Sequence, residues 1–422
     1  MKLQKILLAL PLAGVLLFSS CGKTKGKVTV TYTKATAVYG DIDAVRSTPL
    51  IGQNQDIVDP GKIFIGEDFI LIGEETKGIH VFNNTNAASP TYSSFINLPF
   101  TREFFVKGDV IYAESQYDML KVNISDLSNP VLIDRLENAF SEPMVNDNGQ
   151  VLLGFNYEIK TEQFKVGSRE ARALEEDSYL YYDYQNELIP VSNVPSSFAG
   201  SSDETKGTLN KIALAQSHVY VLGRDKVHVF GDQGSLTDLG STYAGWEMET
   251  IYAEGDHLYI GTMSSMIIMG LGNPENPNVL GEYWHPTSCD PVLPAGDVAY
   301  LTLRTADFSG CGGDENTLQV IDINDPTNPT PLNVIPMTSP YGMAIVDNVL
   351  YVGEGENGVT LFDVTNRQAP IYVSTQTGES VYDILEHPTL PNQILTTGEH
   401  GLNQYEWDAT NQTLNFLSSI DY

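Results

Sequence analysis

The fold is decided by residues 340–376, which read PYGMAIVDNVLYVGEGENGVTLFDVTNRQAPIYVSTQ. This stretch contains four short runs rich in Val, Ile, Tyr and Phe: Met343–Val346, Val349–Val352, Val359–Val364 and Ile371–Ser374. Asp-Asn, Gly-rich and Pro-containing segments separate the runs, and such a pattern predicts strands rather than helices. Four strands of this length predict one β-propeller blade. A blade cannot bury both faces alone, so further copies are expected.

The third run and its following turn recur along the chain. Copies that end in a proline close at Pro90, Pro130, Pro277, Pro329 and Pro370. A spacing of about 40 residues fits a four-stranded blade, and the longer spacing before Pro329 predicts an insertion at 306–316. Three weaker copies without the proline are centred on Tyr181–Ile189, Val227–Leu236 and His400–Leu414. The sequence therefore predicts an all-β propeller of four-stranded antiparallel blades, eight by repeat count with seven as the alternative.

Two of the copies resemble a known repeat. LQVIDINDPTNP (Leu318–Pro329) and VTLFDVTNRQAP (Val359–Pro370) resemble the LVIVD repeat of bacterial and archaeal cell-surface β-propellers. GKIFIGEDFILIGEETKGIHVF (Gly61–Phe82) and CDPVLPAGDVAYLTLR (Cys289–Arg304) are similar to lipoproteins of that family in Gram-negative bacteria. The resemblance covers most of 61–422. It implies the architecture, but it implies no activity, because the family offers no general catalytic motif to carry over.

Residues 1–20 predict an export signal of the lipoprotein type. Lys2 and Lys5 precede the apolar core Ile6–Phe18, and small residues lead to Cys21. This ending resembles a lipobox, although Phe18 stands where that pattern prefers Leu, and it implies a lipid such as palmitate on Cys21. The alternative is an ordinary signal peptide with an incidental cysteine. The apolar core is too short for a membrane-spanning helix.

The rest of the chain is expected to be one domain. Residues 21–27 predict a lipidated tether, and 28–422 a single LVIVD-like propeller with a further insertion near 150–207. Gly22 implies sorting to the outer membrane, facing the periplasm or the surface, by resemblance to lipoproteins. Lys27–Val38 alternates Val and Tyr with Thr and predicts a strand. We expect this strand to complete the last blade, with a position outside the ring as the alternative.

The charge and the cysteine content restrict the possible binding partners and the cellular compartment of the protein. The chain has 23 basic and 54 acidic residues, which excludes a basic nucleic-acid footprint and argues against binding anionic lipid through the folded domain. Apart from Cys21, the cysteines are Cys289 and Cys311, which predict a disulfide in an exported protein. A metal site is the rival reading, but Cys311 has no second Cys or His at ligand spacing.

A search for catalytic motifs is negative. The sequence contains no Gly-x-Ser-x-Gly elbow, no His-Glu-x-x-His and no phosphate-binding loop, and its seven histidines are scattered. No cofactor is expected. The acidic loops Gly353–Gly358 and Gly312–Asn316 could hold calcium, but hairpin turns have the same composition.

One constellation is a candidate site. Polar residues precede the first strand of most units, and these first strands line the channel of a propeller. The candidates for a channel-mouth binding site are Asp59, Glu103, Glu142, Glu249, Asp290, Tyr341 and Asp383, with Tyr382 beside them. Glu249 and Asp290 belong to successive units and are the candidate calcium ligands. The plainer interpretation is that these residues cap turns.

The predicted function is a monomeric, non-catalytic envelope module that binds a protein, a glycan or another ligand and meets the membrane only through its lipid. One alternative is an enzyme, a hydrolase or lyase, with its site at the channel mouth; convergent His, Arg and carboxylate groups would favour it. The other is an assembly scaffold, which would present an apolar or tyrosine patch around Tyr179–Tyr184.

Overall fold

The computed structural model describes residues 26–168, 179–182, 188–190, 211–223, 225–246, 248–285, 291–305 and 312–422. Cys21, Cys289, Asp290 and Cys311 lie outside these ranges, as do the predicted signal and most of the tether. The described strands form eight four-stranded sheets, and the only described helix is α1 (Ile42–Arg46). The all-β prediction is confirmed, and the number of sheets equals the repeat count. No described helix is long and apolar enough to cross a membrane.

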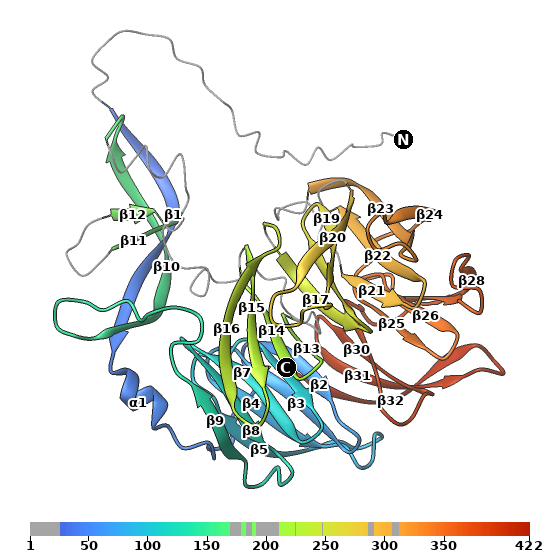
Figure 1. The fold of residues 1–422 in the computed structure, drawn as a ribbon, viewed down its shortest axis with the longest axis horizontal. Coiled ribbons are helices and arrows are strands. Elements are labelled where there is room, and N and C mark those ends of the chain that lie inside the picture. Colours follow the sequence, from blue (N-terminus) through green and yellow to red (C-terminus); the bar gives the residue numbers. More distant parts are fainter. Residues whose placement is uncertain are drawn as a thin grey trace, which may run out of the picture. The chain divides into compact units, whose positions relative to one another are not determined.

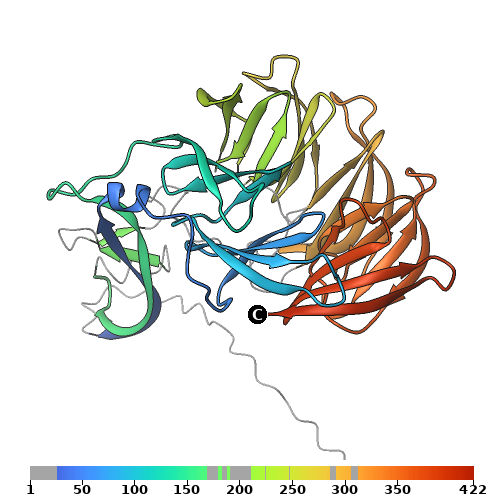
Figure 2. The ribbon, with the colours of Figure 1, turned by 90° about the horizontal axis from the view of Figure 1, so that it is seen from below.

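The chain divides into two compact units, one of Met1–Ala37 and Phe155–Asn193, the other of Val38–Gly154 and Val194–Tyr422. In the second unit, seven sheets are meanders of four consecutive strands, and we number them blade 1 to blade 7 in chain order. In Figure 2 these blades follow one another in a ring. The predicted count of eight therefore matches the number of four-stranded sheets, whereas the alternative count of seven matches the number of blades in the ring.

Every blade has the same strand order, so the bounds can be given by blade. Blade 1 contains β2 (Pro60–Ile65), β3 (Phe69–Glu74), β4 (Gly78–Asn83) and β5 (Thr91–Asn97). Blade 2 contains β6 (Phe104–Lys107), β7 (Val110–Ser115), β8 (Asp118–Asn123) and β9 (Val131–Leu136). Blade 3 contains β13 (Ile212–Ala215), β14 (His218–Leu222), β15 (Lys226–Asp232) and β16 (Leu236–Tyr243).

The remaining four blades continue the pattern. Blade 4 contains β17 (Met248–Glu254), β18 (His257–Thr262), β19 (Ser265–Gly270) and β20 (Asn278–Trp284). Blade 5 contains β21 (Val292–Ala295), β22 (Val298–Thr305), β23 (Gly312–Asp322) and β24 (Thr330–Pro336). Blade 6 contains β25 (Met343–Val346), β26 (Val349–Gly353), β27 (Val359–Asp363) and β28 (Ile371–Gln376). Blade 7 contains β29 (Asp383–Glu386), β30 (Gln393–Gly398), β31 (Gly401–Asp408) and β32 (Thr413–Asp421).

Apolar packing between neighbouring blades holds the ring together. Seven clusters of buried side chains each join two successive blades, and one of them joins blade 7 to blade 1. Both faces of a blade therefore lie against a neighbour, which explains the near-continuous burial of the second and third strands. Each blade contacts only its neighbours, as in other repeat proteins.

Buried tyrosines at the centre of the second strand link successive blades. Tyr112, Tyr220, Tyr259, Tyr300 and Tyr351 occupy equivalent positions in five blades. Tyr220 Oη donates to Pro274 O at 2.9 Å, and Tyr300 Oη donates to Arg367 O at 2.7 Å. Each acceptor lies in the turn after the third strand of a following blade. The tyrosine thus packs in its own interface and satisfies its hydroxyl in a neighbour.

The turns of the repeat explain its Asp and Pro pattern. In blade 5 the Asp322 carboxylate accepts from the Asn324 N–H at 2.9 Å, and Asp325 accepts from the Thr327 N–H at 3.0 Å. The Asn328 N–H also donates to Asp325 O, which closes a four-residue turn before the fourth strand. Short acidic or amide side chains are favoured because they bond their own backbone two residues on.

The prediction that Lys27–Val38 completes the last blade is wrong. The strand β1 (Lys27–Gly40) pairs with β10 (Val151–Lys165) and, in parallel, with β11 (Tyr179–Tyr182), so it is not part of blade 7. Because β29–β32 already supply four strands, the last blade needs no strand from the N-terminus. The alternative, a strand outside the ring, is the one found.

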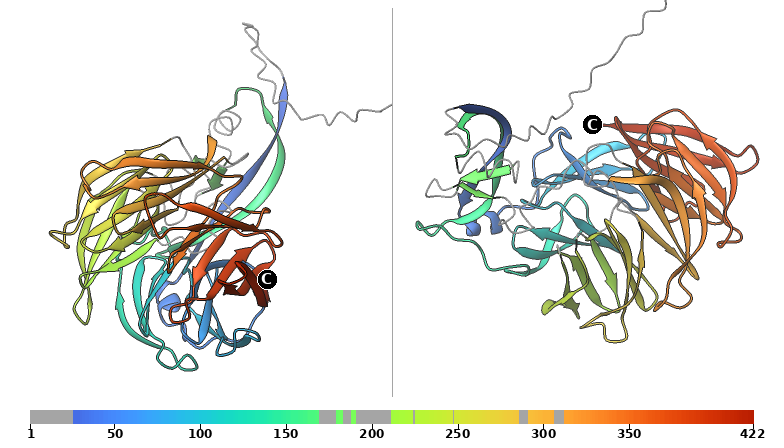
Figure 3. Two further views of the ribbon diagram at one scale, coloured as in Figure 1. Left: turned by 90° about the vertical axis from the view of Figure 1, so that its right-hand side faces the viewer. Right: turned by 90° about the horizontal axis from the view of Figure 1, so that it is seen from above.

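Apolar packing and hydrogen bonds of side chains join the first and last blades, which Figures 2 and 3 both show side by side. A cluster including Ile63, Ile72, Leu395 and Leu402 fills the interface. Beside it the buried amides of Asn84 and Gln404 donate to each other, with N···O distances of 3.0 and 2.8 Å. This amide pair satisfies both side chains and fixes how the ring ends meet.

The other unit contains one mixed sheet in the order β10-β1-β11-β12, where β12 spans Leu188–Pro190 (Figure 1). β1 and β10 form its long ribbon, on which Tyr32 packs against Phe164 and donates to Glu162. The weak repeat copy at Tyr181–Ile189 and the predicted insertion near 150–207 fall largely in this unit. Its parallel pairing distinguishes the sheet from a blade.

Candidate functional site

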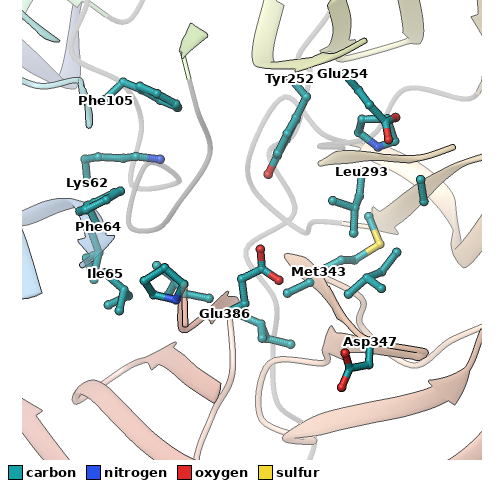
Figure 4. A pocket seen from close by; sticks show the side chains of 18 of the residues that line it. Lys62, Phe64, Ile65, Phe105, Tyr252, Glu254, Leu293, Met343, Asp347 and Glu386 are labelled. Carbon is teal, nitrogen blue, oxygen red and sulfur yellow. The ribbon is translucent and has the colours of Figure 1, made fainter. Parts of the chain in front are cut away.

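First strands from six blades line a cavity of about 600 Å³ in the centre of the ring (Figure 4). A volume of this size is typical of sites for small molecules. Most of the residues that line it are apolar, among them Phe64, Phe105, Leu293 and Met343, but charged side chains also contribute to its surface. We call this cavity the channel pocket.

Strand register defines equivalent channel positions. The residues that pair with the central residue of the second strand form the middle ring, which is Phe64, Phe105, Ala213, Tyr252, Leu293, Ala344 and Leu385. All but Ala213 line the channel pocket. Tyr252 brings the ring's only hydroxyl, and Figure 4 shows it pointing into the cavity.

A second ring lies two residues earlier along each strand, and side chains two apart share one face of a strand. This charged ring is Lys62, Glu103, Lys211, Thr250, Pro291, Gly342 and Asp383. Around the circle the charges alternate over four neighbouring blades, from Asp383 in blade 7 through Lys62 and Glu103 to Lys211 in blade 3. Blades 4 to 6 supply small or uncharged residues.

The charges of this ring act on one another in a buried setting. Burial lowers the pKa of Lys62 to about 8, against the opposing effect of Glu103 and Asp383. Burial raises the pKa of Glu103 to about 7, although Lys211 and Lys62 favour its ionised form. The free-energy cost of removing the ionised Glu103 carboxylate from water exceeds its favourable electrostatic interaction with the two lysines.

Two oxygens of the charged ring are buried without a hydrogen-bond partner. They are Glu103 Oε2 and Thr250 Oγ1, whose residues are 9% and 0% exposed. Buried polar atoms are normally paired, so such atoms are unusual enough to need an explanation.

Further charged groups surround Glu103. Arg102 Nε lies 3.5 Å from Glu75 Oε2, and burial raises the pKa of both Glu75 and Glu114. Arg102 and Lys211 oppose these shifts. Carboxylates and cations from blades 1, 2 and 3 therefore converge at this end of the channel.

The opposite end of the channel pocket carries Glu254, Asp347 and Glu386. Glu254 Oε1 accepts from the Gly296 N–H at 3.2 Å, and its buried Oε2 has no partner. Burial raises the pKa of Glu386, and Figure 4 shows its carboxylate directed into the cavity. Burial, together with the charges of Asp383 and Glu386, also raises the pKa of Tyr252.

The structure separates the predicted mouth residues by register. Glu103 and Asp383 belong to the charged ring, whereas Glu249 and Tyr341 each lie one residue before a ring position, Glu249 at a register shift in β17 and Tyr341 outside β25. Tyr341 instead lies under Arg304, with 4.1 Å between the guanidinium carbon and the ring centre. Its ring also lies 5.0 Å from that of Tyr382.

Two other predicted residues lie off the ring. Asp59 and Glu142 are exposed, and the ring position of blade 3 is Lys211, a residue that was not predicted. Asp290 lies outside the described residues. Sequence reasoning missed Lys62, Lys211 and Tyr252, and the signal that locates them is the recurring tyrosine of the second strand, which fixes the register.

Within the ranges that the structure describes, no group of three or more His, Cys, Asp or Glu could hold a metal ion. The acidic loop Gly353–Gly358 is a hairpin. Its Glu354 carboxylate accepts from the Thr338 N–H and from Thr360 Oγ1, each at 2.7 Å. Glu354 therefore has a structural role.

Comparison with known proteins agrees with the architecture. The family model for the LVIVD repeat matches residues 312–333. The chain is a β-propeller that carries an LVIVD repeat in blade 5. This propeller is similar to a solved protein from Lactobacillus plantarum, with 12% identity, a TM-score of 0.53, and 85% of this chain and 96% of that chain covered. It is also similar to the Pan2 WD40 domain of Neurospora crassa, with 9% identity, a TM-score of 0.50, and 87% and 92% covered. No curated protein matches its sequence.

Proposed function

We propose that this LVIVD-repeat propeller is a non-catalytic binding module, anchored to the outer membrane of the cell envelope by a lipid on Cys21. The observation that carries the binding role is the channel pocket. Its apolar walls come from six blades, and a few polar groups, Lys62, Tyr252 and Glu386, point into it. Ligand sites commonly combine apolar walls with a small number of placed polar groups.

The contents of the pocket favour binding over catalysis. Carboxylates, lysines and Arg102 converge beside one end of the channel, but none of the seven histidines lines the cavity. Burial raises the pKa of Glu103 and of Glu114, and Glu103 Oε2 has no hydroxyl or thiol as a hydrogen-bond partner, so no nucleophile–base pair forms at this oxygen. The side chains of Tyr179–Tyr184, on which the scaffold alternative depends, lie outside the described residues.

The anchoring proposal rests on the sequence of residues 1–22. We also propose a disulfide between Cys289 and Cys311, because export to an oxidising compartment would allow it to form. Changing Cys21→Ser should move the protein from the membrane fraction to the soluble fraction. Retention in the membrane would overturn the lipid assignment.

The binding role is tested by capturing the protein from its native envelope and identifying what remains bound. A matched capture with Tyr252→Phe removes the one hydroxyl of the middle ring and should lose a channel ligand while keeping partners bound elsewhere. The recovered ligand should be unchanged after prolonged incubation with the protein. Chemical conversion of the ligand would instead establish an enzyme.

A further inference from the structure

The charges that line the channel pocket do not balance one another. The charged residues of its lining are Lys62, Glu254, Asp347, Arg367 and Glu386, so carboxylates outnumber cations. They belong to a chain whose formal net charge is −31. A cavity that carries an excess of one sign of charge concentrates ions of the opposite sign. The lining therefore favours a ligand with positive charge.

Both cations of the lining have carboxylates of the protein near them. The negative charges of two members of the charged ring favour the protonated form of Lys62. Arg367 Nη1 lies beside Gly296, and the N–H of the same glycine donates to Glu254 Oε1 at 3.2 Å. The positive charges of Lys62 and Arg367 are thus offset within the protein, and they do not select an anionic ligand.

Asp347 and Glu386 are the carboxylates that remain, and Figure 4 shows that of Glu386 directed into the cavity. Burial raises the pKa of Glu386, and no charged group among the described residues opposes this shift. Burial also raises the pKa of Tyr252, and the negative charges of Asp383 and Glu386 raise it further. Figure 4 shows the Tyr252 hydroxyl and the Glu386 carboxylate pointing toward each other across the cavity. The space between them is therefore negative.

The walls determine the kind of cation. A metal ion needs several oxygen ligands, and within the described part of the chain no group of three or more His, Cys, Asp or Glu could hold one. Phe64, Phe105 and Tyr252 supply aromatic rings, and Leu293 and Met343 supply aliphatic surface. Aromatic faces attract ammonium groups, and apolar walls favour the burial of an attached apolar body. A cavity of about 600 Å³ has the size of a small-molecule site.

We infer that the channel pocket binds a small organic ammonium ion with an apolar body, an inference that rests on the proposed binding function. The ammonium group donates to the Glu386 carboxylate and to the Tyr252 hydroxyl oxygen. The apolar body packs against the aromatic and aliphatic side chains of the middle ring. Glu386 is a binding residue in this arrangement and sets the preference for positive charge.

The test is calorimetric titration of the purified protein at neutral pH with ligands that share a carbon skeleton and differ in charge. One set is 2-phenylethylamine, 2-phenylethanol and phenylacetate, and the other is hexylamine, hexanol and hexanoate. We expect at least one amine to bind about tenfold more tightly than its alcohol, and its carboxylate to bind most weakly. Glu386→Gln should weaken that amine about tenfold, because a charge-assisted hydrogen bond is lost, and leave the alcohol unaltered.

The control variant is Glu379→Gln, which makes the same chemical change outside the channel pocket and should leave every affinity unaltered. Failure of both amines to bind, equal affinities of each amine and its alcohol, or an amine affinity that Glu386→Gln does not change would each overturn the inference. If the amines failed while capture from the native envelope still recovered a molecule that Tyr252→Phe loses, the proposed binding function would stand and its ligand would belong to another class.

Discussion

Two buried glutamates in neighbouring blades are held in opposite ways. Glu74, at the end of β3, is fully buried and accepts hydrogen bonds from two backbone N–H groups, from Lys77 Nζ at 2.7 Å and from the His80 ring. Glu103, just before β6, is also buried, but its Oε2 has no partner. Burial alone therefore does not identify a functional carboxylate in this protein.

The pKa values express the same difference. Burial acts to raise the pKa of Glu74, but the hydrogen bonds from Lys77, Val58 and His80 lower it below the usual value. Burial raises the pKa of Glu103 to about 7, and no hydrogen bond compensates for it. The hydrogen bonds of Glu74 offset its burial and stabilise the fold, whereas Glu103 Oε2 lacks such a bond.

The largest effect should come from the saturated acid. Glu74→Gln replaces a carboxylate by a group that can accept on one side only, so buried donors lose their partner. We expect the free energy of unfolding to fall by roughly 3 kcal/mol. Urea denaturation measures this, with Glu379→Gln as a surface control that should change it by less than about 0.5 kcal/mol. An unaltered midpoint for Glu74→Gln would contradict the structural role.

The amide pair between the ring ends extends the comparison to uncharged groups. Asn84→Leu leaves the buried Gln404 Oε1 without its donor, although Gln404 Nε2 still donates to Ser418 Oγ, and the loss should cost about 2 kcal/mol. The double variant Asn84→Leu/Gln404→Leu should recover part of this loss, because both polar groups are then gone. Denaturation of the two variants tests the point, and additive losses would show that the two amides do not interact.

Glu103 should give stability a pH dependence opposite to that of Glu74. Between pH 4.5 and about 7 the folded protein holds a proton on Glu103 that the unfolded chain has released, so this group makes the fold less stable as pH rises. Glu74 contributes stability above the unfolded pKa that is lost as pH falls. The stabilities of the wild type and of Glu103→Gln, measured by thermal unfolding across this range, should differ in slope, by up to roughly 3 kcal/mol in total. If the stability of the two proteins changed with pH in parallel, Glu103 would not be the cause of the pH dependence.

The strands of each blade could be predicted from the sequence because they depend on patterns of neighbouring residues. Alternating Val, Ile and Tyr between Gly, Asn and Pro turns predicts strands, and the repeat requires neighbours. The sequence was not sufficient at the channel, where Glu249 and Tyr341 were grouped with Glu103 although each lies one residue before a ring position. Nor could it place Lys27–Val38, since the choice between a blade edge and β10 depends on pairing between distant segments.

The smallest effect on stability should come from Thr250, compared with Thr360. The Thr360 hydroxyl donates to Glu354 at 2.7 Å, so Thr360→Val should cost about 1 kcal/mol. The buried Thr250 hydroxyl has no partner, so Thr250→Val removes a polar atom without breaking a bond and should change stability by less than about 0.5 kcal/mol. Urea denaturation of both variants measures this difference. A stability loss at Thr250 equal to that at Thr360 would mean that its hydroxyl serves the fold, as the Glu354 carboxylate does.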